Sequence, residues 1–267
     1  MLTLVSQAWR SWKRDKALAV LAVIALATGI GCATAIFTVV DAVLLKPLPY
    51  SQGDRWVALF GGSTNDSHHF SALSLADLLA YRKQTHSFET FGYFSLASDF
   101  NLTSPGRPQH IQGVEVSPSL IAHTGAYPIA GRFFTASDGP NVAIISNRLF
   151  RQFGPGILDR QIRLSGHSYT VIGAMPAGFR LPIVTVNNVD SNNDVWLPIK
   201  MPRNEARLSG YSDYAGYAKL KPGVTLAQAR ADAKRVAARL QKRNHFDDPT
   251  YTAALFSLRD TVVKSIR

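Results

Sequence analysis

No arrangement of reactive side chains in this sequence is typical of an enzyme. The 267-residue chain has one cysteine, Cys32, and seven histidines scattered among apparent turns and the ends of elements. No glycine is followed by lysine, so the phosphate-binding loop of Walker-type ATPases is missing. Neither a G-x-S-x-G elbow nor an H-E-x-x-H zinc motif occurs. We therefore expect no catalytic residue, and any ATPase would have to be a separate subunit.

Metal binding would need several ligand side chains that converge. The densest group of such residue types is His68 and His69 beside Asp66. Adjacent side chains in an extended loop point in opposite directions, so the two histidines make a poor pair of ligands. A single cysteine also cannot build a thiolate site. The sequence therefore predicts no metal and no other cofactor.

The formal net charge of +11 raises the question of nucleic-acid binding. The placement of the basic residues argues against it. Four of them directly precede a long apolar segment, and ten Lys/Arg stand against three acids between Arg203 and Arg243, many on one predicted helix. No zinc-finger, basic-zipper or RNA-binding signature accompanies them. We expect no nucleic-acid partner and a solvated or lipid-facing basic surface.

The elements that would position any functional residue begin with the apolar segment from Ala17 to Val40, which has no charged side chain. As a helix it would be roughly 36 Å long, and the hydrocarbon core of a bilayer is about 30 Å thick. A cleaved signal peptide is the main alternative, but its apolar region is normally shorter, about 7–15 residues. The sequence thus predicts a retained transmembrane helix over residues 17–45, with Lys46 and Pro47 beyond it.

Residues 1–16 read as a cytoplasmic helix lying in the inner interface of the membrane. Leu2, Val5, Trp9 and Trp12 share one helical face, and tryptophans favour headgroup depth. The predicted interfacial anchors are Trp9, Arg10, Trp12, Lys13 and Arg14. The basic residues before the span place the N-terminus in the cytoplasm. Residues 46–267 then lie outside the cytoplasm, on a single-pass protein.

Small residues recur at four-residue spacing within the predicted span. They form two rows, which are Ala27, Gly31, Ala35 and Ala25, Gly29, Ala33. Such rows let a second helix approach closely. Alanine is also common in spans that pack against nothing, and both interpretations stay open. The glycines favour helix packing.

The rest of the chain has the pattern of a mixed α/β domain, so the predicted fold class is α+β, as one domain or two subdomains. Helices are expected at 75–84 after the cap Ser74, at 147–153, and from a capping box at Thr225 and Gln228 onward. Strands are expected at 88–96, 109–116, 141–146, 161–164, 169–174, 194–199, 214–220 and 252–258. The polar stretches Gly61–His69 and Asn187–Asn193 are predicted to be surface loops.

The order of these segments resembles the MacB-like periplasmic core domain of ABC transporter permeases of the macrolide-exporter and FtsX-like class. Its most specific parts are YTVIGAMPAGF, ending at Phe179, and LKPGVTLAQA, together with the G-R-F-F-x-x-x-D element from Gly131 to Asp138. The resemblance covers the chain from about residue 10 to 260.

The resemblance implies a permease of the bacterial cytoplasmic membrane that works as a dimer with a separate or fused ATPase. In such permeases a first transmembrane helix precedes a periplasmic domain that docks partners and relays conformational change, and three further helices follow. The implied partners are the lipid bilayer, further permease helices or a second permease chain, an ATP-binding subunit and an envelope protein. The sequence shows no second apolar run before Arg267, which matches the first part of a permease only.

Three hypotheses follow. The chain is a truncated permease component, or an independent membrane-tethered periplasmic binding module with no transport role, or a tethered envelope enzyme. The motif order favours the first.

Overall fold

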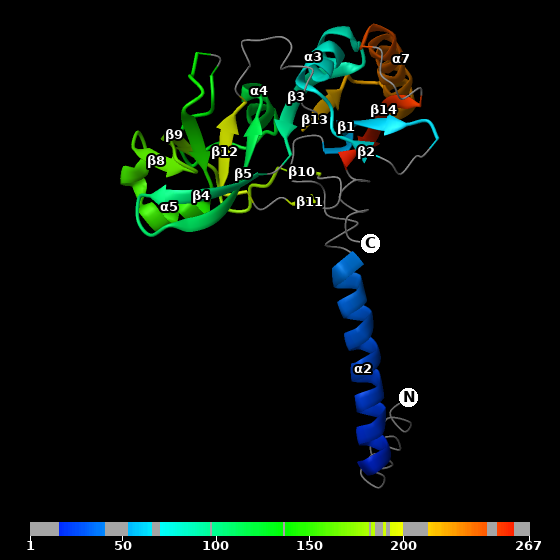
Figure 1. Ribbon diagram of the computed structural model, residues 1–267. Coiled ribbons are helices and arrows are strands. Elements are labelled where there is room, and N and C mark those ends of the chain that lie inside the picture. The colour runs from blue at the N-terminus through cyan, green and yellow to red at the C-terminus, as the bar shows by residue number, and fades with distance from the viewer. Residues whose placement is uncertain are drawn as a thin grey trace. The chain divides into compact units, whose positions relative to one another are not determined.

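The computed structural model describes residues 16–40, 53–65, 70–96, 98–135, 137–181, 183–184, 189–190, 193–199, 213–244 and 250–258. The chain divides into two compact units, Met1–Pro47 and Leu48–Arg267. Figure 1 shows the course of the chain through each unit.

In the first unit, helix α2 runs over Lys16–Val40. Its described side chains, at residues 20–35 and 37, are all exposed. Judged on the described residues alone, no helix has both the length and the hydropathy that a membrane span requires. The helix predicted from residue 17 is confirmed as far as Val40. Residues 1–15 and 41–45 lie outside the described residues, and the membrane span stays a prediction.

The second unit begins and ends in an open antiparallel sheet. Its strands are β3 (Phe88–Ser95), β13 (Tyr214–Leu220), β1 (Trp56–Ser63) and β14 (Tyr251–Ser257), in that order, and the short β2 (Phe70–Ser71) also pairs with β1. Helices α3 (Leu75–Gln84) and α7 (Leu226–Asn244) cover one face of this sheet. Side chains alternate between the faces, since Val57 and Leu59 pack under the helices while Trp56 and Ala58 point to the other core.

The remaining strands close on themselves. From β12 (Val195–Pro198) the order passes through β7 (Val142–Ile145), β9 (His167–Ala174), β8 (Gln161–Leu164), β4 (Ser98–Ser104) and β5 (Gln109–Val116), and β5 pairs again with β12. The result is a small barrel with its own apolar interior. Strand β5 also pairs with β3 at Phe94 and Val116, which joins the barrel to the open sheet.

Shorter elements complete the domain. Helices α4 (Pro118–His123) and α5 (Asn147–Phe153) and the 3-10 turns η2 (Gly53–Arg55) and η3 (Pro155–Ile157) connect the strands. Strand β6 (Ala130–Gly131) pairs with β9, and β10 (Ile183–Val184) pairs with β11 (Val189–Asp190) as a separate ribbon.

Local signals in the sequence account for the helix starts. The Ser74 hydroxyl accepts a hydrogen bond from the Asp77 backbone N–H at 3.1 Å. The Thr225 hydroxyl accepts one from the Gln228 N–H at 3.2 Å, and the Gln228 side chain accepts one from the Thr225 N–H at 2.9 Å. The predicted capping box of α7 is therefore confirmed.

The loop predicted at Gly61–His69 is partly wrong, because β1 continues to Ser63 and both Gly61 and Gly62 are buried. A Cβ at Gly62 would lie 2.9 Å from the Cβ of Ala254 on the neighbouring strand. Glycine is therefore needed there for close strand pairing, whereas a glycine pair in a sequence normally indicates a turn. In the second predicted loop, Asn187–Asn193, residues 189–190 form a strand and Asn193 is buried.

Candidate interaction surface

One exposed apolar feature stands out on the second unit. Among its described residues, the large apolar side chains that are exposed are Tyr127, at 78%, and Ile129, at 48%. Both belong to the segment between α4 and β6. The Tyr127 ring lies 6.3 Å from the ring of Phe133, centre to centre. We call Tyr127, Ile129 and Phe133 the apolar tip.

The backbone around the apolar tip is fixed to strand β9. The N–H of Ile129 donates to the Ala174 carbonyl at 2.8 Å, and the N–H of Arg132 donates to the Ile172 carbonyl at 2.9 Å. Between these bonds Gly131 faces Gly173 with a φ of +74°, and a Cβ on it would lie 2.2 Å from the Ile172 oxygen. Two backbones can approach this closely only without side chains. The segments GRFF and YTVIGAM thus pack directly on each other.

An ion pair between Arg132 and Asp138 holds together the loop that follows Gly131. The Arg132 guanidinium donates to both carboxylate oxygens of Asp138, at 2.6 and 2.7 Å. The Thr135 N–H and hydroxyl also donate to Asp138, at 2.7 and 2.9 Å. The hydrogen bonds from Arg132, helped by those from Thr135 against a smaller desolvation cost, hold the pKa of Asp138 well below its usual range. The tip is therefore presented by a pre-ordered loop.

We expect Asp138→Asn to loosen this loop without unfolding the domain. A partly exposed ion pair contributes up to about 1 kcal/mol, so amide hydrogen exchange at residues 127–135 should accelerate roughly fivefold. Asp99→Asn is the control, since Asp99 forms an exposed pair with His110 on the barrel. Equal acceleration in both variants, or none in Asp138→Asn, would contradict a structural role for the pair.

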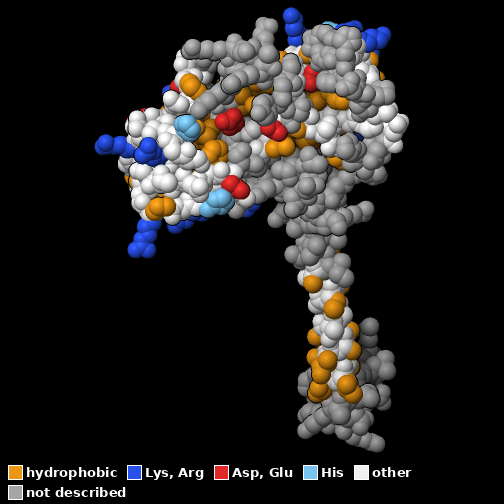
Figure 2. Space-filling view, viewed as in Figure 1, with side chains coloured by type: hydrophobic (Ala, Val, Ile, Leu, Met, Phe, Trp, Pro, Cys, Tyr) orange, Lys and Arg blue, Asp and Glu red, His pale blue; other side chains and the backbone are white. Residues whose placement is uncertain are grey.

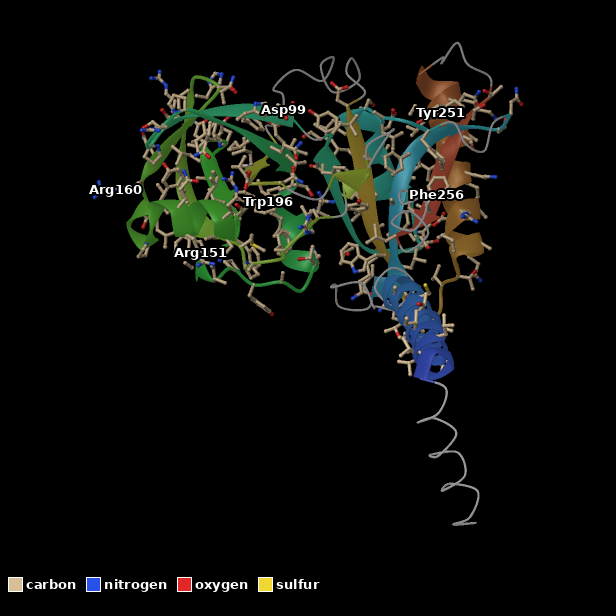
Figure 3. All side chains as sticks on the ribbon, turned by 90° about the horizontal axis from the view of Figure 1, so that it is seen from below. Asp99, Arg151, Arg160, Trp196, Tyr251 and Phe256 are labelled. Carbon is tan, nitrogen blue, oxygen red and sulfur yellow. The ribbon has the colours of Figure 1, made fainter. Side chains whose placement is uncertain are left out.

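A second group of hydrogen bonds ties the neighbouring segments together. The Arg148 guanidinium donates to Asp194 at 2.6 and 2.8 Å, and the Ser146 hydroxyl donates to Asp194 at 2.9 Å. The buried Trp196, labelled in Figure 3, meets the ring of Phe179 edge-on at 5.2 Å. The segments VAIIS, MPAGF and DVWLPI therefore form one framework beneath the tip.

The two carboxylates of this region hold loops in place. Asp138 and Asp194 are both engaged by arginine and by hydroxyl groups. Within the described residues, no three His, Cys, Asp or Glu side chains are grouped as they would be around a metal ion. The candidate ligands Asp66, His68 and His69 lie outside those residues.

The helix-packing residues predicted from the sequence all lie on α2. Ala25, Ala27, Ala33 and Ala35 are exposed, as are Gly29 and Gly31, and no atom lies within 4 Å of a Cβ built on either glycine. Their packing role stays a prediction. The predicted anchors Trp9, Arg10, Trp12, Lys13 and Arg14 fall outside the described residues.

Sequence reasoning did not single out the apolar tip. The available signal was Tyr127-Pro128-Ile129, an apolar run between Gly125 and Gly131 where a turn would normally be polar. Its exposure depends on long-range packing.

Comparison with known proteins identifies the family of this chain. The family described as the MacB-like periplasmic core domain matches residues 19–236, which is more than half of the sequence. The chain belongs to this family. Membership confirms the resemblance carried by the GRFF and YTVIGAMPAGF segments. It indicates the periplasmic domain of an ABC transporter permease, and this family is not a known class of enzymes.

Solved structures share the fold of this MacB-like domain. A domain of a putative permease protein from Porphyromonas gingivalis has a TM-score of 0.59 and 22% identity, over 78% of this chain and 92% of that one. The periplasmic region of MacB from Actinobacillus actinomycetemcomitans has a TM-score of 0.57 and 14% identity, over 84% and 97%. The extracellular domain of the noncanonic ABC-type transporter YknZ from Gram-positive bacteria has a TM-score of 0.52 and 16% identity, over 74% and 98%. None of the curated proteins matches the chain in sequence.

Proposed function

We propose that this chain is a component of an ABC transporter permease in the bacterial cytoplasmic membrane. In this proposal α2 spans the membrane with its N-terminus in the cytoplasm, and the domain that follows is periplasmic. The domain docks a partner protein and relays movement that a separate ATP-hydrolysing subunit produces. Family membership supports the setting, and the uncharged segment from Ala17 to Val40 supports the span.

The observation that carries the relay is an unbroken series of paired strands from the start of the domain to the apolar tip. It runs from β1 through β13, β3, β5, β12, β7 and β9 to β6. Strand β1 is buried from Trp56 to Gly62, so displacement of the chain before it must move the sheet. Close-packed interiors transmit such displacements instead of absorbing them.

The apolar tip has the composition of a protein-binding surface. Tyrosine is enriched at the energetic centres of protein interfaces, and here Tyr127 is exposed together with Ile129. The loop is already ordered by its hydrogen bonds to β9, so binding would cost little conformational entropy.

The double variant Tyr127→Ser, Ile129→Ser tests the docking role. We expect recovery of the periplasmic partner with the full chain, crosslinked in membranes and purified in detergent, to fall at least about tenfold, since such centres contribute roughly 2 kcal/mol or more each. The ATP-binding subunit should be recovered as before. The matched control is His110→Ser, Gln161→Ser, which removes two exposed side chains from the barrel.

Unchanged recovery of the partner would contradict docking at the tip. Recovery of a partner with no ATP-binding subunit from any version of the chain would instead support the alternative, an independent membrane-tethered binding module without a transport role.

A further inference from the structure

The outer surface of α3 and α7 is strongly basic. The two helices lie side by side over the open sheet, since both contribute to the same apolar core. Among the side chains that the structure describes on them, the exposed charged ones are all cationic: Arg82, Lys83, Arg230, Lys234, Arg235, Arg239 and Lys242. We call these seven residues the basic face. Figure 2 shows Lys and Arg side chains at the upper edge of the domain, where Figure 1 places these helices.

The fold removes negative charge from this face. The two helices contain one carboxylate each, Asp77 and Asp232, and both are buried. Asp232 points inward, where it accepts hydrogen bonds from the N–H groups of His86 and Ser87 at 2.8 and 2.9 Å. An amphipathic surface helix usually mixes both signs of charge on its outer side, so the cationic excess here points to an anionic partner.

Three of the basic side chains also form hydrogen bonds within the domain. Arg230 donates to the Leu255 carbonyl at 2.8 Å, and Arg235 donates to Asp232 at 2.6 Å. Arg239 donates a long bond to the Gln84 side-chain oxygen at 3.5 Å, between exposed groups of the two helices. Lys234, Arg239 and Lys242 follow one another along the exposed side of α7. Their long stems let the charged groups adjust to an uneven array of anions.

We infer that the basic face binds the anionic headgroups of a phospholipid bilayer. A protein partner fits less well, because no large apolar side chain is exposed among the described side chains of either helix, and lysine is depleted from the centres of protein interfaces. A second copy of this chain would bring like charges together if it used the same face. Each Lys or Arg near an anionic bilayer raises binding about fivefold.

This inference rests on the proposed function in one respect, because anchoring beside the bilayer supplies a high effective concentration of headgroups. A weak affinity would then suffice to hold the domain against the membrane in one orientation.

The test uses residues 48–267, which contain all three apolar cores and so form a complete folding unit. Co-sedimentation is measured with vesicles of phosphatidylcholine alone and of phosphatidylcholine mixed with phosphatidylglycerol. We expect at least about tenfold stronger binding to the anionic vesicles, lost in high salt. The variant Lys234→Glu, Arg239→Glu, Lys242→Glu should weaken that binding at least tenfold.

A matched variant separates the basic face from net charge. Arg151→Glu, Arg160→Glu, Arg163→Glu makes the same charge change at exposed positions of the barrel region, where Figure 3 labels Arg151 and Arg160. It should weaken binding less than twofold. An equal loss in both variants would overturn the inference, as would equal binding to both vesicles. Binding to polyglutamate but not to vesicles would overturn it in favour of an acidic protein. None of these outcomes depends on α2 or on an ATPase.

Discussion

Replacing Gly131 with alanine should lower the free energy of unfolding of the domain by about 3 kcal/mol, because two costs add. A side chain at positive φ costs about 1–2 kcal/mol, and forcing apart tightly packed atoms costs about 1–3 kcal/mol. Both apply at Gly131, where φ is +74° and the new Cβ would meet the Ile172 oxygen at 2.2 Å. The melting temperature of residues 48–267, followed by circular dichroism, should fall by about 6–12 °C.

Gly139 provides the control for this variant. It lies eight positions further along, has no positive φ, and has no atom within 4 Å of a built Cβ. Gly139→Ala should therefore leave the melting temperature within about 2 °C of the unmodified protein. If Gly131→Ala were equally harmless, the close contact between the segment around Gly131 and β9 would not exist as described, and the apolar tip would lose its support.

A second large effect is expected at Asp232. One of its oxygens accepts from the N–H groups of His86 and Ser87 and from the Ser87 hydroxyl, all within 2.9 Å. Asp232→Ala would leave the two buried Ser87 donors and the partly buried His86 N–H without this acceptor, which costs about 3 kcal/mol in total. Urea unfolding of residues 48–267 should show this as a lower midpoint with an unchanged slope. Asp213→Ala, at an exposed aspartate before β13, should show no shift.

The same residue predicts how stability depends on pH. Burial opposes ionisation of Asp232, but the hydrogen bonds from Ser87 and His86 and the charge of Arg235 outweigh it, so its pKa lies below the ordinary value. A lowered pKa in the folded state means that the carboxylate stabilises the fold at neutral pH. That contribution is lost as the pH falls below about 4, the pKa of an unfolded aspartate, and through the folded value. In Asp232→Ala the free energy of unfolding should therefore fall less steeply with decreasing pH below about 4. An unchanged pH dependence would contradict this role of the Asp232 carboxylate.

Local interactions explain which parts of this fold were predictable. The start of α3 at Ser74 and the capping box of α7 depend on side chains that bond three residues away. The hairpin of β8 and β9 turns at Ser165 and Gly166, which both have positive φ, so a short glycine-containing turn was enough to indicate it. The predicted strands at 109–116 and 214–220 coincide with β5 and β13.

Long-range packing explains the rest. The barrel closes where Gly113 of β5 lies beside Val195 of β12, two residues far apart in the sequence. A Cβ at Gly113 would lie 2.4 Å from a methyl carbon of Val195, so closure at this point depends on the absence of a side chain. Nothing local to either strand reveals that partner. The polar strand β4 and the exposure of Tyr127 also follow only from the assembled structure.

The pairing of β1 with β14 has a mechanical consequence. Val57 lies opposite Ser257, so the chain enters and leaves the described sheet at the same end of two neighbouring antiparallel strands. A load that draws the segments before β1 and after β14 apart would break the hydrogen bonds between the two strands one after another. A load that moves both segments together leaves those bonds unstretched and displaces the sheet as one body. This strand pair is thus stiff toward a load that moves both segments together and yielding toward a load that separates them.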